Sequence, residues 1–412
     1  MIMQDNEKNP ALRFKGFTDP WEQRKLGEIA VFSKGVGYSK NDLCEEGTPI
    51  ILYGRLYTKY ETCIFDVDTF VKEKAGGVYS KGGEVIVPAS GETAEDISIA
   101  SVVVKPGILL GGDLNIVSPT AEYDSAFLAL TISSGATHKY LSSLAQGKSV
   151  VHLHNADIQS VSAKFPTKRE QEKIHLLFGK IDTLITLHQR KYEKLVNIKK
   201  SMLNKMFPPN GASVPEIRFK GFTDPWEQRK LGDVADIVGG GTPSTNNPNY
   251  WDGDIDWYAP AEIAGQIYFD SSQRKITEQG YENSSAKMLP PGTVLFTSRA
   301  GIGKTAILSK KGCTNQGFQS IVPHNDELDS YFVFSRTDEL KQYGELVGAG
   351  STFVEVSGKQ MAAMNLKMPT TIEEQQTIGR FFKRLDTLIT LHQRKLEKLQ
   401  NIKKSCLEKM FV

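Results

Sequence analysis

Two stretches of this sequence occur twice, almost half a chain apart. Residues 13–27 return without a change as residues 218–232, and residues 182–191 return as residues 386–395. The offsets are 205 and 204 residues in a chain of 412. The sequence therefore predicts two copies of one structural unit. The stretches between the repeats have diverged almost completely, so the two copies share a frame and differ in what that frame holds.

The second repeat lies in a segment with the spacing of a long helix. Its seam residues follow one another at alternating steps of four and three, the heptad pattern of a coiled coil. In the first copy they are Ile181, Ile185, His188, Tyr192, Leu195, Lys199, Met202 and Met206. In the second copy they are Leu385, Ile389, His392, Leu396, Leu399, Lys403, Cys406 and Met410. Neither series is interrupted by glycine or proline, so we expect two long helices.

Both series of seam positions are symmetric about their midpoints, which allows the helices to pack antiparallel against each other. In that arrangement His188 faces Lys403, and Lys199 faces His392. Polar residues at core positions often fix the register of a coiled coil. The alternative is that these side chains lie along the edge of the seam with their polar ends in water.

The divergent stretches are typical of mixed α/β domains. Runs such as residues 83–89 and 292–298 predict short strands between turns. Lys-Phe-Pro-Thr at 164–167 and Lys-Met-Pro-Thr at 367–370 close the two stretches at matching places, which predicts one shared fold. The expected fold class is α+β: two similar mixed α/β domains separated by two long helices that pack as an antiparallel coiled coil, related by a pseudo-two-fold repeat. The expected order is an N-terminal arm at 1–20, a first domain at 21–165, a first helical spacer at 166–207, a linker at 208–217, a second domain at 218–368 and a second helical spacer at 369–412.

The net charge of +2 is unevenly distributed. Residues 165–207 hold ten basic and four acidic residues, a net charge of +6, and residues 368–411 hold nine and five, a net charge of +4. Residues 28–164 and 233–367 each hold eleven basic and sixteen acidic residues, a net charge of −5. This distribution counts against a simple basic DNA-binding globule, so any nucleic-acid surface on the two domains is a local patch.

The sequence gives no sign of a membrane or secreted protein. No apolar run approaches the ~20 residues of a membrane span, and the first residues lack the apolar core of a signal peptide. The four cysteines have no CxxC spacing, which indicates reduced thiols in a cytoplasmic protein.

Several short motifs recur in a fixed order. Pro-Trp-Glu-Gln-Arg-Lys-Leu-Gly opens each half at 20–27 and 225–232, and a Glu-Gln pair follows each domain at 170–171 and 374–375. The second domain also carries Trp-Tyr-Ala-Pro-Ala-Glu-Ile at 257–263, Thr-Ser-Arg-Ala-Gly-Ile-Gly-Lys-Thr at 297–305 and Thr-Asn-Gln-Gly-Phe at 314–318. Over essentially its whole length, the chain resembles the specificity subunits of type I restriction–modification systems.

That resemblance implies a function and a set of partners. Each domain would be a target-recognition domain that reads one half of a split sequence in double-stranded DNA. The helices would set the gap between the halves and dock two methyltransferase subunits, which bind S-adenosylmethionine and methylate adenine N6. Restriction subunits, which use ATP and Mg, would join the same complex. The chain itself would bind no cofactor and catalyse no reaction.

Base readout in the major groove favours Arg, Lys, Asn and Gln, with Ser and Thr as further donors. In the first domain the candidates, among interleaved cations and aromatic residues, are Ser39, Lys40, Arg55, Tyr57, Lys59 and Tyr60. In the second domain they are Thr242, Ser244, Arg299, Lys304, Asn315 and Gln316. The alternative for each residue is a plain surface or packing role.

Other motifs do not support an enzyme. The run 301–305 resembles a phosphate loop, but Ser298 stands where the pattern needs glycine, so a turn between strands is expected. Asp252, Asp254 and Asp256 alternate in a turn-rich stretch, which predicts a solvated hairpin rather than a metal site. The alternating pair His152 and His154 lacks a third ligand at matching spacing, so no zinc site is expected. A repeat-built protein scaffold that never touches DNA stays open as the alternative function.

Overall fold

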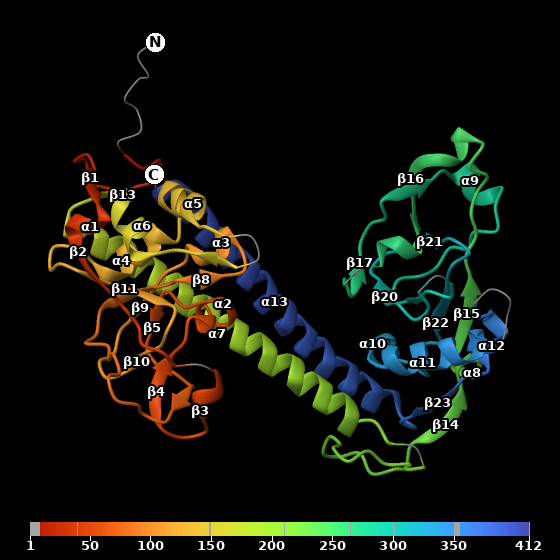
Figure 1. Ribbon diagram of the computed structural model, residues 1–412. Helices are drawn as coiled ribbons and strands as arrows, with labels where there is room; N and C mark the ends of the chain where they lie inside the picture. Colours follow the sequence, from red (N-terminus) through yellow and green to blue (C-terminus); the bar gives the residue numbers. More distant parts are fainter. Residues whose placement is uncertain are drawn as a thin grey trace. The chain divides into compact units, whose positions relative to one another are not determined.

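The computed structural model describes residues 9–38, 40–147, 150–209, 211–263, 265–299, 301–349 and 355–411. The chain divides into two compact units (Figure 1). Unit 1 comprises Met1–Arg190 with Gln393–Val412, and unit 2 comprises Lys191–His392. Each unit therefore combines one domain with part of both long helices. Among the described residues, no helix is long and apolar enough to cross a membrane.

In chain order, the strands and helices that begin in unit 1 are β1 (Glu22–Lys25), α1 (Leu26–Ile29), β2 (Ala30–Lys34), η1 (Lys40–Asp42), β3 (Leu43–Cys44), β4 (Thr48–Ile51), α2 (Gly54–Thr58), β5 (Cys63–Ile64), β6 (Phe70–Val71), β7 (Glu84–Pro88), β8 (Ser90–Gly91), α3 (Ala94–Ile97), β9 (Ser101–Val103), β10 (Leu109–Leu110), β11 (Leu114–Pro119), α4 (Ser125–Ile132), α5 (Gly135–Leu144), β12 (Val151–His152), α6 (Asn155–Ser160), β13 (Ser162–Phe165) and α7 (Lys168–Lys205).

Those that begin in unit 2 are β14 (Glu227–Lys230), α8 (Leu231–Val234), β15 (Ala235–Gly239), η2 (Pro248–Tyr250), β16 (Trp251–Tyr258), η3 (Pro260–Glu262), β17 (Tyr268–Phe269), β18 (Arg274–Ile276), α9 (Glu278–Glu282), β19 (Val294–Phe296), β20 (Thr305–Leu308), β21 (Cys313–Thr314), β22 (Gln319–Pro323), α10 (Ser330–Phe334), α11 (Thr337–Gly348), α12 (Gly358–Ala362), β23 (Asn365–Met368) and α13 (Ile372–Met410).

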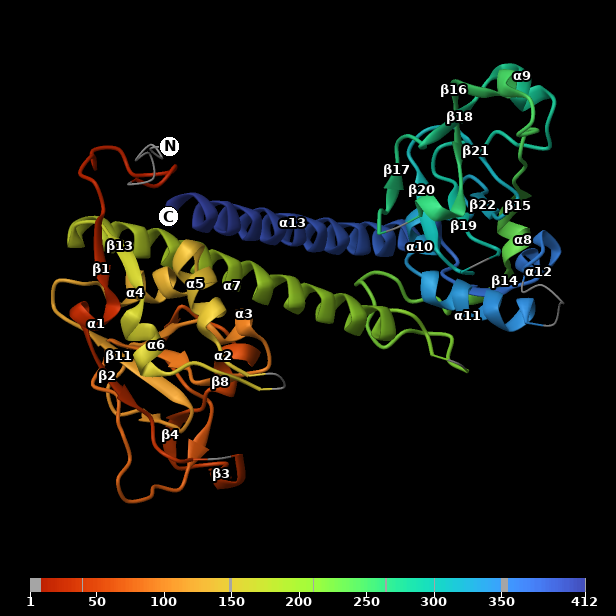
Figure 2. The same cartoon turned by 45° about the horizontal axis from the view of Figure 1, so that its top comes forward.

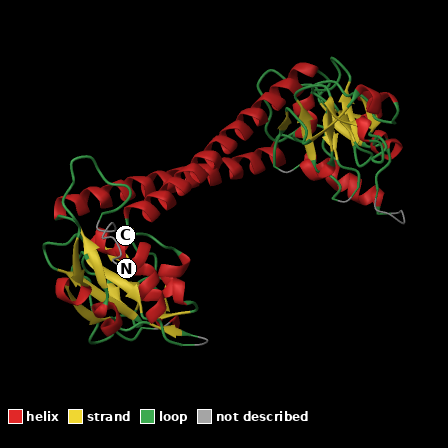
Figure 3. Cartoon of the chain, turned by 90° about the horizontal axis from the view of Figure 1, so that it is seen from above, coloured by secondary structure: helices red, strands yellow, loops and turns green. Residues whose placement is uncertain are grey.

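The two units share the order of their main sheets. The five-stranded sheet has the order β2-β11-β7-β9-β5 in unit 1 and β15-β22-β19-β20-β17 in unit 2. In both sheets the last pair is parallel and the others are antiparallel. A second sheet repeats the order β10-β4-β6 as β21-β16-β18. Figure 3 shows the strands of each unit gathered together with helices around them. The predicted fold class and the shared fold of the two divergent stretches are confirmed.

One aromatic cluster is also repeated in the cores. Phe411, beyond the end of α13, packs against Phe127 and Phe178 in unit 1, with ring centroids 5.5 and 6.0 Å apart. Phe207, beyond the end of α7, makes the equivalent contacts with Phe332 and Phe382 in unit 2, at 5.7 and 5.9 Å. Buried aromatic side chains contribute large apolar areas, so the end of one long helix completes the core at the start of the other.

The first repeated tract is held to each long helix by a buried ion pair. Arg13 donates two hydrogen bonds to Glu170, at 2.7 and 2.8 Å, and Arg218 donates two to Glu374 at the same distances. Glu170 is fully buried and Glu374 nearly so. Two parallel N–H···O bonds fix both distance and orientation. The glutamate of the Glu-Gln motif therefore holds the first repeated tract against the first turn of each long helix.

The glutamine of the same motif fixes a second element. Gln171 accepts a hydrogen bond from the backbone N–H of Asp124 at 2.9 Å, and Gln375 accepts one from that of Asp329 at 3.1 Å. Each aspartate in turn caps a helix, because its carboxylate accepts from the backbone of a residue in the first turn of α4 or α10, at 2.8 Å. The Glu-Gln pair thus connects each long helix both to the first repeated tract and to the N-terminus of α4 or α10.

The long helices match the expected segments and run antiparallel within each unit. In unit 1 the end of α13 lies alongside the first part of α7 (Figure 1 and Figure 2). Lys403 forms an ion pair with Asp182 there, and in unit 2 Lys199 forms one with Asp386, each with an N···O distance of 2.6 Å. Both carboxylates belong to the second repeated tract. The lysines therefore do hold the register, with aspartates as their ion-pair partners, while the contacts predicted between His188 and Lys403 and between His392 and Lys199 stay predictions.

All sixteen seam positions are buried or half-buried, and Ile181, Met206, Leu385 and Met410 are the buried ones. Other apolar residues of the same helices are exposed; they are Leu176, Leu184, Leu187, Val196, Leu388, Leu391 and Ile402. The seam positions are therefore packed, whereas these seven residues form an outer apolar set.

Removing the ion pair between Arg13 and Glu170 should destabilise unit 1. In Glu170→Ala, the partly buried guanidinium of Arg13 loses its partner, so we expect the free energy of unfolding to fall by about 3 kcal/mol. Urea unfolding followed by tryptophan fluorescence measures the change. Glu172→Ala, two residues on at an exposed position, is the matched control and should change stability by less than about 0.5 kcal/mol. Equal losses in both variants would contradict this role for the ion pair.

A contact between His175 and Asp124, which unit 2 lacks, should make the stability of unit 1 depend on pH. The His175 imidazole lies 3.0 Å from Asp124, and this hydrogen bond raises the pKa of His175. The pair therefore stabilises unit 1 fully below the unfolded-state histidine pKa of about 6.5, and this contribution is lost as pH rises through the higher folded-state value. Gly379 occupies the corresponding place in unit 2.

The unfolding free energies of the original protein and of His175→Gln should thus differ more at pH 5.5 than at pH 8.5. Urea titrations at the two pH values measure this difference. A gap that is independent of pH would show that the ion pair does not contribute.

Candidate nucleic-acid interface

In unit 2, three loops meet at one end of the five-stranded sheet. They are residues 240–246 after β15, residues 297–304 between β19 and β20, and residues 315–318 before β22. The Gly241 N–H donates to the Thr314 carbonyl, and the Ser298 N–H donates to the Gly317 carbonyl, both at 2.8 Å. These backbone bonds hold the loops together, and their polar side chains are placed by the sheet.

Most of the candidates in the second domain lie on these loops. The Thr242 hydroxyl donates to the amide oxygen of Gln316, and the Asn315 amide oxygen accepts from the Gly317 N–H at 2.8 Å. Arg299 is about half exposed and forms an ion pair with Glu355 at 2.7 Å. Ser244 is exposed nearby on the first loop. The structure therefore brings residue types suited to base readout to one end of the sheet.

Lys304 lies at the far side of the 297–304 turn. It is exposed and, with Lys199 and Thr337, lines a depression of about 500 Å³. Gly301 and Gly303 both have positive φ, 100° and 93°, which a tight turn between strands requires. The expected turn is confirmed.

In the first domain, Arg55 lies in α2 and has a different environment. Its side chain is only 9% exposed; its guanidinium pairs with Glu61 at 2.7 Å and Asp68 at 2.9 Å, and it donates to the Asp66 carbonyl at 3.1 Å. Lys59 pairs with the same Asp68 at 2.8 Å. In this position Arg55 ties the loop after α2 to the domain, which favours the packing alternative for this residue.

The aromatic candidates are also engaged within unit 1. The Tyr57 hydroxyl donates to the Ser90 carbonyl at 2.7 Å, and burial raises its pKa. Tyr60 is exposed, and its hydroxyl donates to the Ala100 carbonyl at 3.3 Å. Lys40 is exposed at the start of η1, and Ser39 lies outside the described residues. Arg55 and Lys59 thus share Asp68, and the hydroxyls of Tyr57 and Tyr60 donate to backbone carbonyls of the domain.

The end of the unit 1 sheet that corresponds to the unit 2 loops can be located from close backbone contacts. A Cβ atom on Gly35 would lie 1.9 Å from the carbonyl oxygen of Gly111, and one on Gly240 would lie 1.9 Å from that of Asn315. Only glycine fits at either position. Gly111 therefore corresponds to Asn315, and Gly112 to Gln316. Unit 1 has no side chains where unit 2 presents an asparagine and a glutamine.

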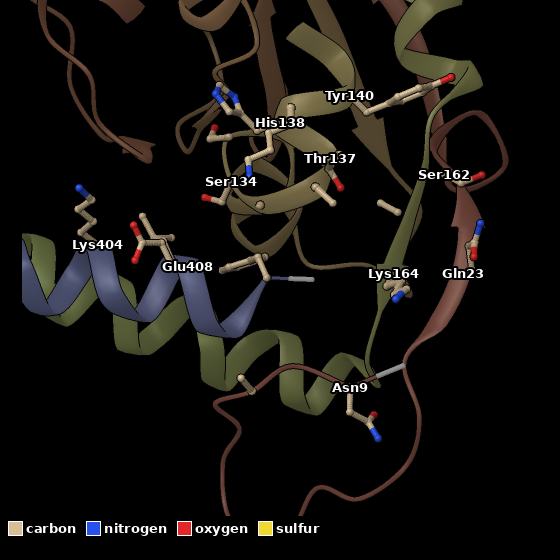
Figure 4. A pocket seen from close by; sticks show the side chains of 18 of the residues that line it. Asn9, Gln23, Ser134, Thr137, His138, Tyr140, Ser162, Lys164, Lys404 and Glu408 are labelled. Atoms are coloured by element: carbon tan, nitrogen blue, oxygen red, sulfur yellow. The ribbon is translucent and has the colours of Figure 1, made fainter. Parts of the chain in front are cut away.

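A second concavity lies elsewhere in unit 1. It has a volume of about 1400 Å³ between α5, the β1–β13 pair and the end of α13. Figure 4 shows Lys404 and Glu408 on α13 at one side and His138 on α5 at the other. At the corresponding place in unit 2, Arg336 packs over the rings of Phe207 and Phe332, with its guanidinium 5.4 and 5.7 Å from their centroids.

Neither acidic nor histidine pairs form a metal cluster in the described part of the chain. Asp252, Asp254 and Asp256 lie on the long strand β16, which corrects the prediction of a solvated hairpin, because the strand continues through an irregularity in its pairing with β18. The Asp256 carboxylate accepts hydrogen bonds from the N–H and hydroxyl of Ser272, at 2.9 and 3.0 Å. It thus serves a local turn.

Comparisons with known proteins decide the family. The model of the type I restriction modification DNA specificity domain matches residues 18–197 and again residues 223–401. The chain belongs to this family. Each match covers one divergent domain and most of the long helix that follows it in the sequence.

Curated relatives are specificity subunits. The MjaIX subunit of Methanocaldococcus jannaschii is 34% identical over 190 residues, which is 45% of this chain and 44% of that protein. The EcoR124I/EcoR124II subunit of Escherichia coli is 28% identical over 170 residues, 39% of this chain and 41% of that protein. These matches span less than half of each relative. The crystal structure of an S subunit from M. genitalium shares the fold, with a TM-score of 0.67 at 14% identity over 98% of this chain and 99% of that one.

The chain thus carries two copies of the type I restriction modification DNA specificity domain. The residue types in the sequence pointed to polar residues that the structure places on these loops of unit 2, and they did not indicate Glu355, which pairs with Arg299. The exact repeats show the offset between the two copies. The sequences of the two domains differ too much for their residues to be matched without the structure.

Truncating Arg55 should reduce stability rather than select a different target. We expect Arg55→Ala to lower the free energy of unfolding by about 2 kcal/mol because three hydrogen bonds to a mostly buried guanidinium are lost. Lys59→Ala removes one exposed ion pair and should cost less than about 1 kcal/mol. Thermal unfolding measures both. An Arg55→Ala protein of unchanged stability with an altered DNA target would restore Arg55 as a reading residue.

Proposed function

We propose that each unit reads one half of a split target in double-stranded DNA, and that the long helices set the gap between the halves and dock two methyltransferase subunits. Support comes from two domains with one topology whose loops differ at the same end of the sheet. Two domains that read different sequences need the same supporting structure and different loops, and the two units have this arrangement. Base edges are read by side chains on such loops, while the frame fixes their position.

The outer face of the helices supports docking of two copies of one partner. Leu184 and Leu187 are exposed on α7, and Leu388 and Leu391 are exposed on α13 to nearly the same extent, 42–44%. All four belong to the identical repeated tract. Exposed apolar residues that lie together on one surface are typical of an interface. Two identical surfaces suit two identical methyltransferase subunits.

The cofactors of the complex belong to its other subunits in this proposal. S-adenosylmethionine would be bound by the methyltransferase subunits, which methylate adenine N6, and ATP and Mg by the restriction subunits. The complex would work in the cytoplasm, where the DNA is. The specificity subunit contributes recognition alone.

A protein scaffold that never binds DNA is the alternative function. Salt distinguishes the two: DNA binding that neutralises phosphates weakens steeply as salt rises. Because both domains carry a net charge of −5, tight binding should also require the basic helices or the methyltransferase partner.

The direct test is to express the chain with its methyltransferase subunit and map N6-methyladenine across the host genome. The expected result is a new motif of two defined halves separated by a gap of fixed length. No added methylation, with both subunits soluble and associated, would refute the proposal.

Replacing the exposed leucines of one repeated tract with aspartate should prevent binding of one of the two methyltransferase subunits. We expect Leu184→Asp with Leu187→Asp to leave one methyltransferase per chain instead of two, because a buried interface does not tolerate unpaired carboxylates. Native mass spectrometry gives the stoichiometry. Thr183→Asp with Thr186→Asp, which adds the same two charges at other exposed positions of α7, is the control. Two bound copies in the double variant would exclude this surface.

A further inference from the structure

Two matched pairs of backbone hydrogen bonds define which residues correspond at the loop end of the two units. In unit 2 the Ser298 N–H donates to Gly317 at 2.8 Å, and the Ser298 carbonyl accepts from Val356 at 3.1 Å. In unit 1 the Ala89 N–H donates to Asp113 at 2.7 Å, and the Ala89 carbonyl accepts from Leu153 at 3.1 Å. Ala89 therefore corresponds to Ser298.

The neighbours of these residues then correspond as well. Ser90 follows Ala89 as Arg299 follows Ser298, and His152 precedes Leu153 as Glu355 precedes Val356. In both units the side chains at these two positions contact each other. Arg299 pairs with Glu355 at 2.7 Å, and the Ser90 hydroxyl lies 3.2 Å from Nδ1 of His152, where β8 and β12 pair. One position in the fold thus holds an ion pair in unit 2 and a serine–histidine pair in unit 1.

Two further side chains with rings, those of His154 and Tyr57, lie next to the Ser90–His152 pair. His154 is exposed two residues beyond His152, with parallel rings, 1° between their planes and 6.4 Å between centroids. On the other side, the Tyr57 hydroxyl donates to the Ser90 carbonyl. Because Nδ1 of His152 is engaged by Ser90, Nε2 at the other side of the exposed ring is left for a further partner.

We infer that Ser90, His152 and His154 are the base-reading residues of unit 1, at the position where Arg299, oriented by Glu355, reads a base in unit 2. The inference rests on the proposed function and names where each half of the target is chosen. An imidazole N–H donates to a purine N7 or to a guanine O6 in the major groove, whereas an arginine guanidinium binds guanine at both atoms. The half read by unit 2 should therefore contain a guanine beside Arg299.

Two features of the structure make these residues better placed than the first-domain candidates. His152 and His154 are exposed at the loop end, whereas the Arg55 guanidinium is held by Glu61 and Asp68. Unit 1 also carries the Gly111–Gly112 backbone where unit 2 offers Asn315 and Gln316, so its reading surface has to come from the neighbouring segments.

The test uses the full chain in complex with its methyltransferase, on DNA duplexes that carry the mapped target. Binding is measured for the target and for duplexes with one base pair changed in either half. His152→Ala and His154→Ala should lower discrimination at one or two base pairs of one half by about ten-fold each. Discrimination in the other half, and the gap length, should not change. Glu355→Gln should lower discrimination in the other half alone.

His324→Ala is the matched control, since His324 follows the far end of β22 and pairs with Asp236. It should leave both halves unchanged. If the histidine variants weaken binding to all duplexes equally, or leave discrimination intact, the assignment of these residues is wrong. Absence of any split motif for the original protein would instead refute the proposed function, so the two failures are distinguishable.

Discussion

The frame of each unit depends on one buried ion pair, between the arginine of the first repeated tract and the glutamate that begins a long helix. Arg13 and Glu170 in unit 1, and Arg218 and Glu374 in unit 2, meet with the same two-bond geometry. A buried carboxylate without its arginine is costly, so the strand entry, the helix start and the sheet edge stay together. Loops on that sheet can change without moving the helix that positions them.

The sequence predicted this frame well because its residues are repeated and periodic. The heptad spacing gave the helices, and the seam positions are the packed ones. The lysines at two seam positions do form ion pairs between the helices, but with Asp182 and Asp386 of the repeated tract. Helical periodicity gives the face on which a residue lies, and it does not say which of several polar neighbours a long lysine side chain will reach.

The proposed reading surface was harder to predict. In unit 2, Arg299, Asn315 and Gln316 were recognised by residue type, and the sheet brings their loops together. In unit 1 the same reasoning favoured Arg55, because no pattern in the sequence reveals that three carboxyl and carbonyl groups surround it. From the sequence alone, His152 and His154 are considered only as possible zinc ligands, and Ser90 is not singled out. Their place became visible through backbone hydrogen bonds, which side-chain identity does not encode.

Membership of the specificity family, the constant frame and the variable loop end support one account, in which target choice lies in two separable domains. The most direct measurement is the methylation motif of a chain in which residues 28–164 are replaced by a second copy of residues 233–367, expressed with the same methyltransferase. The account predicts a target whose two halves are the same sequence, namely the half read by unit 2. A motif that keeps the original first half would contradict it.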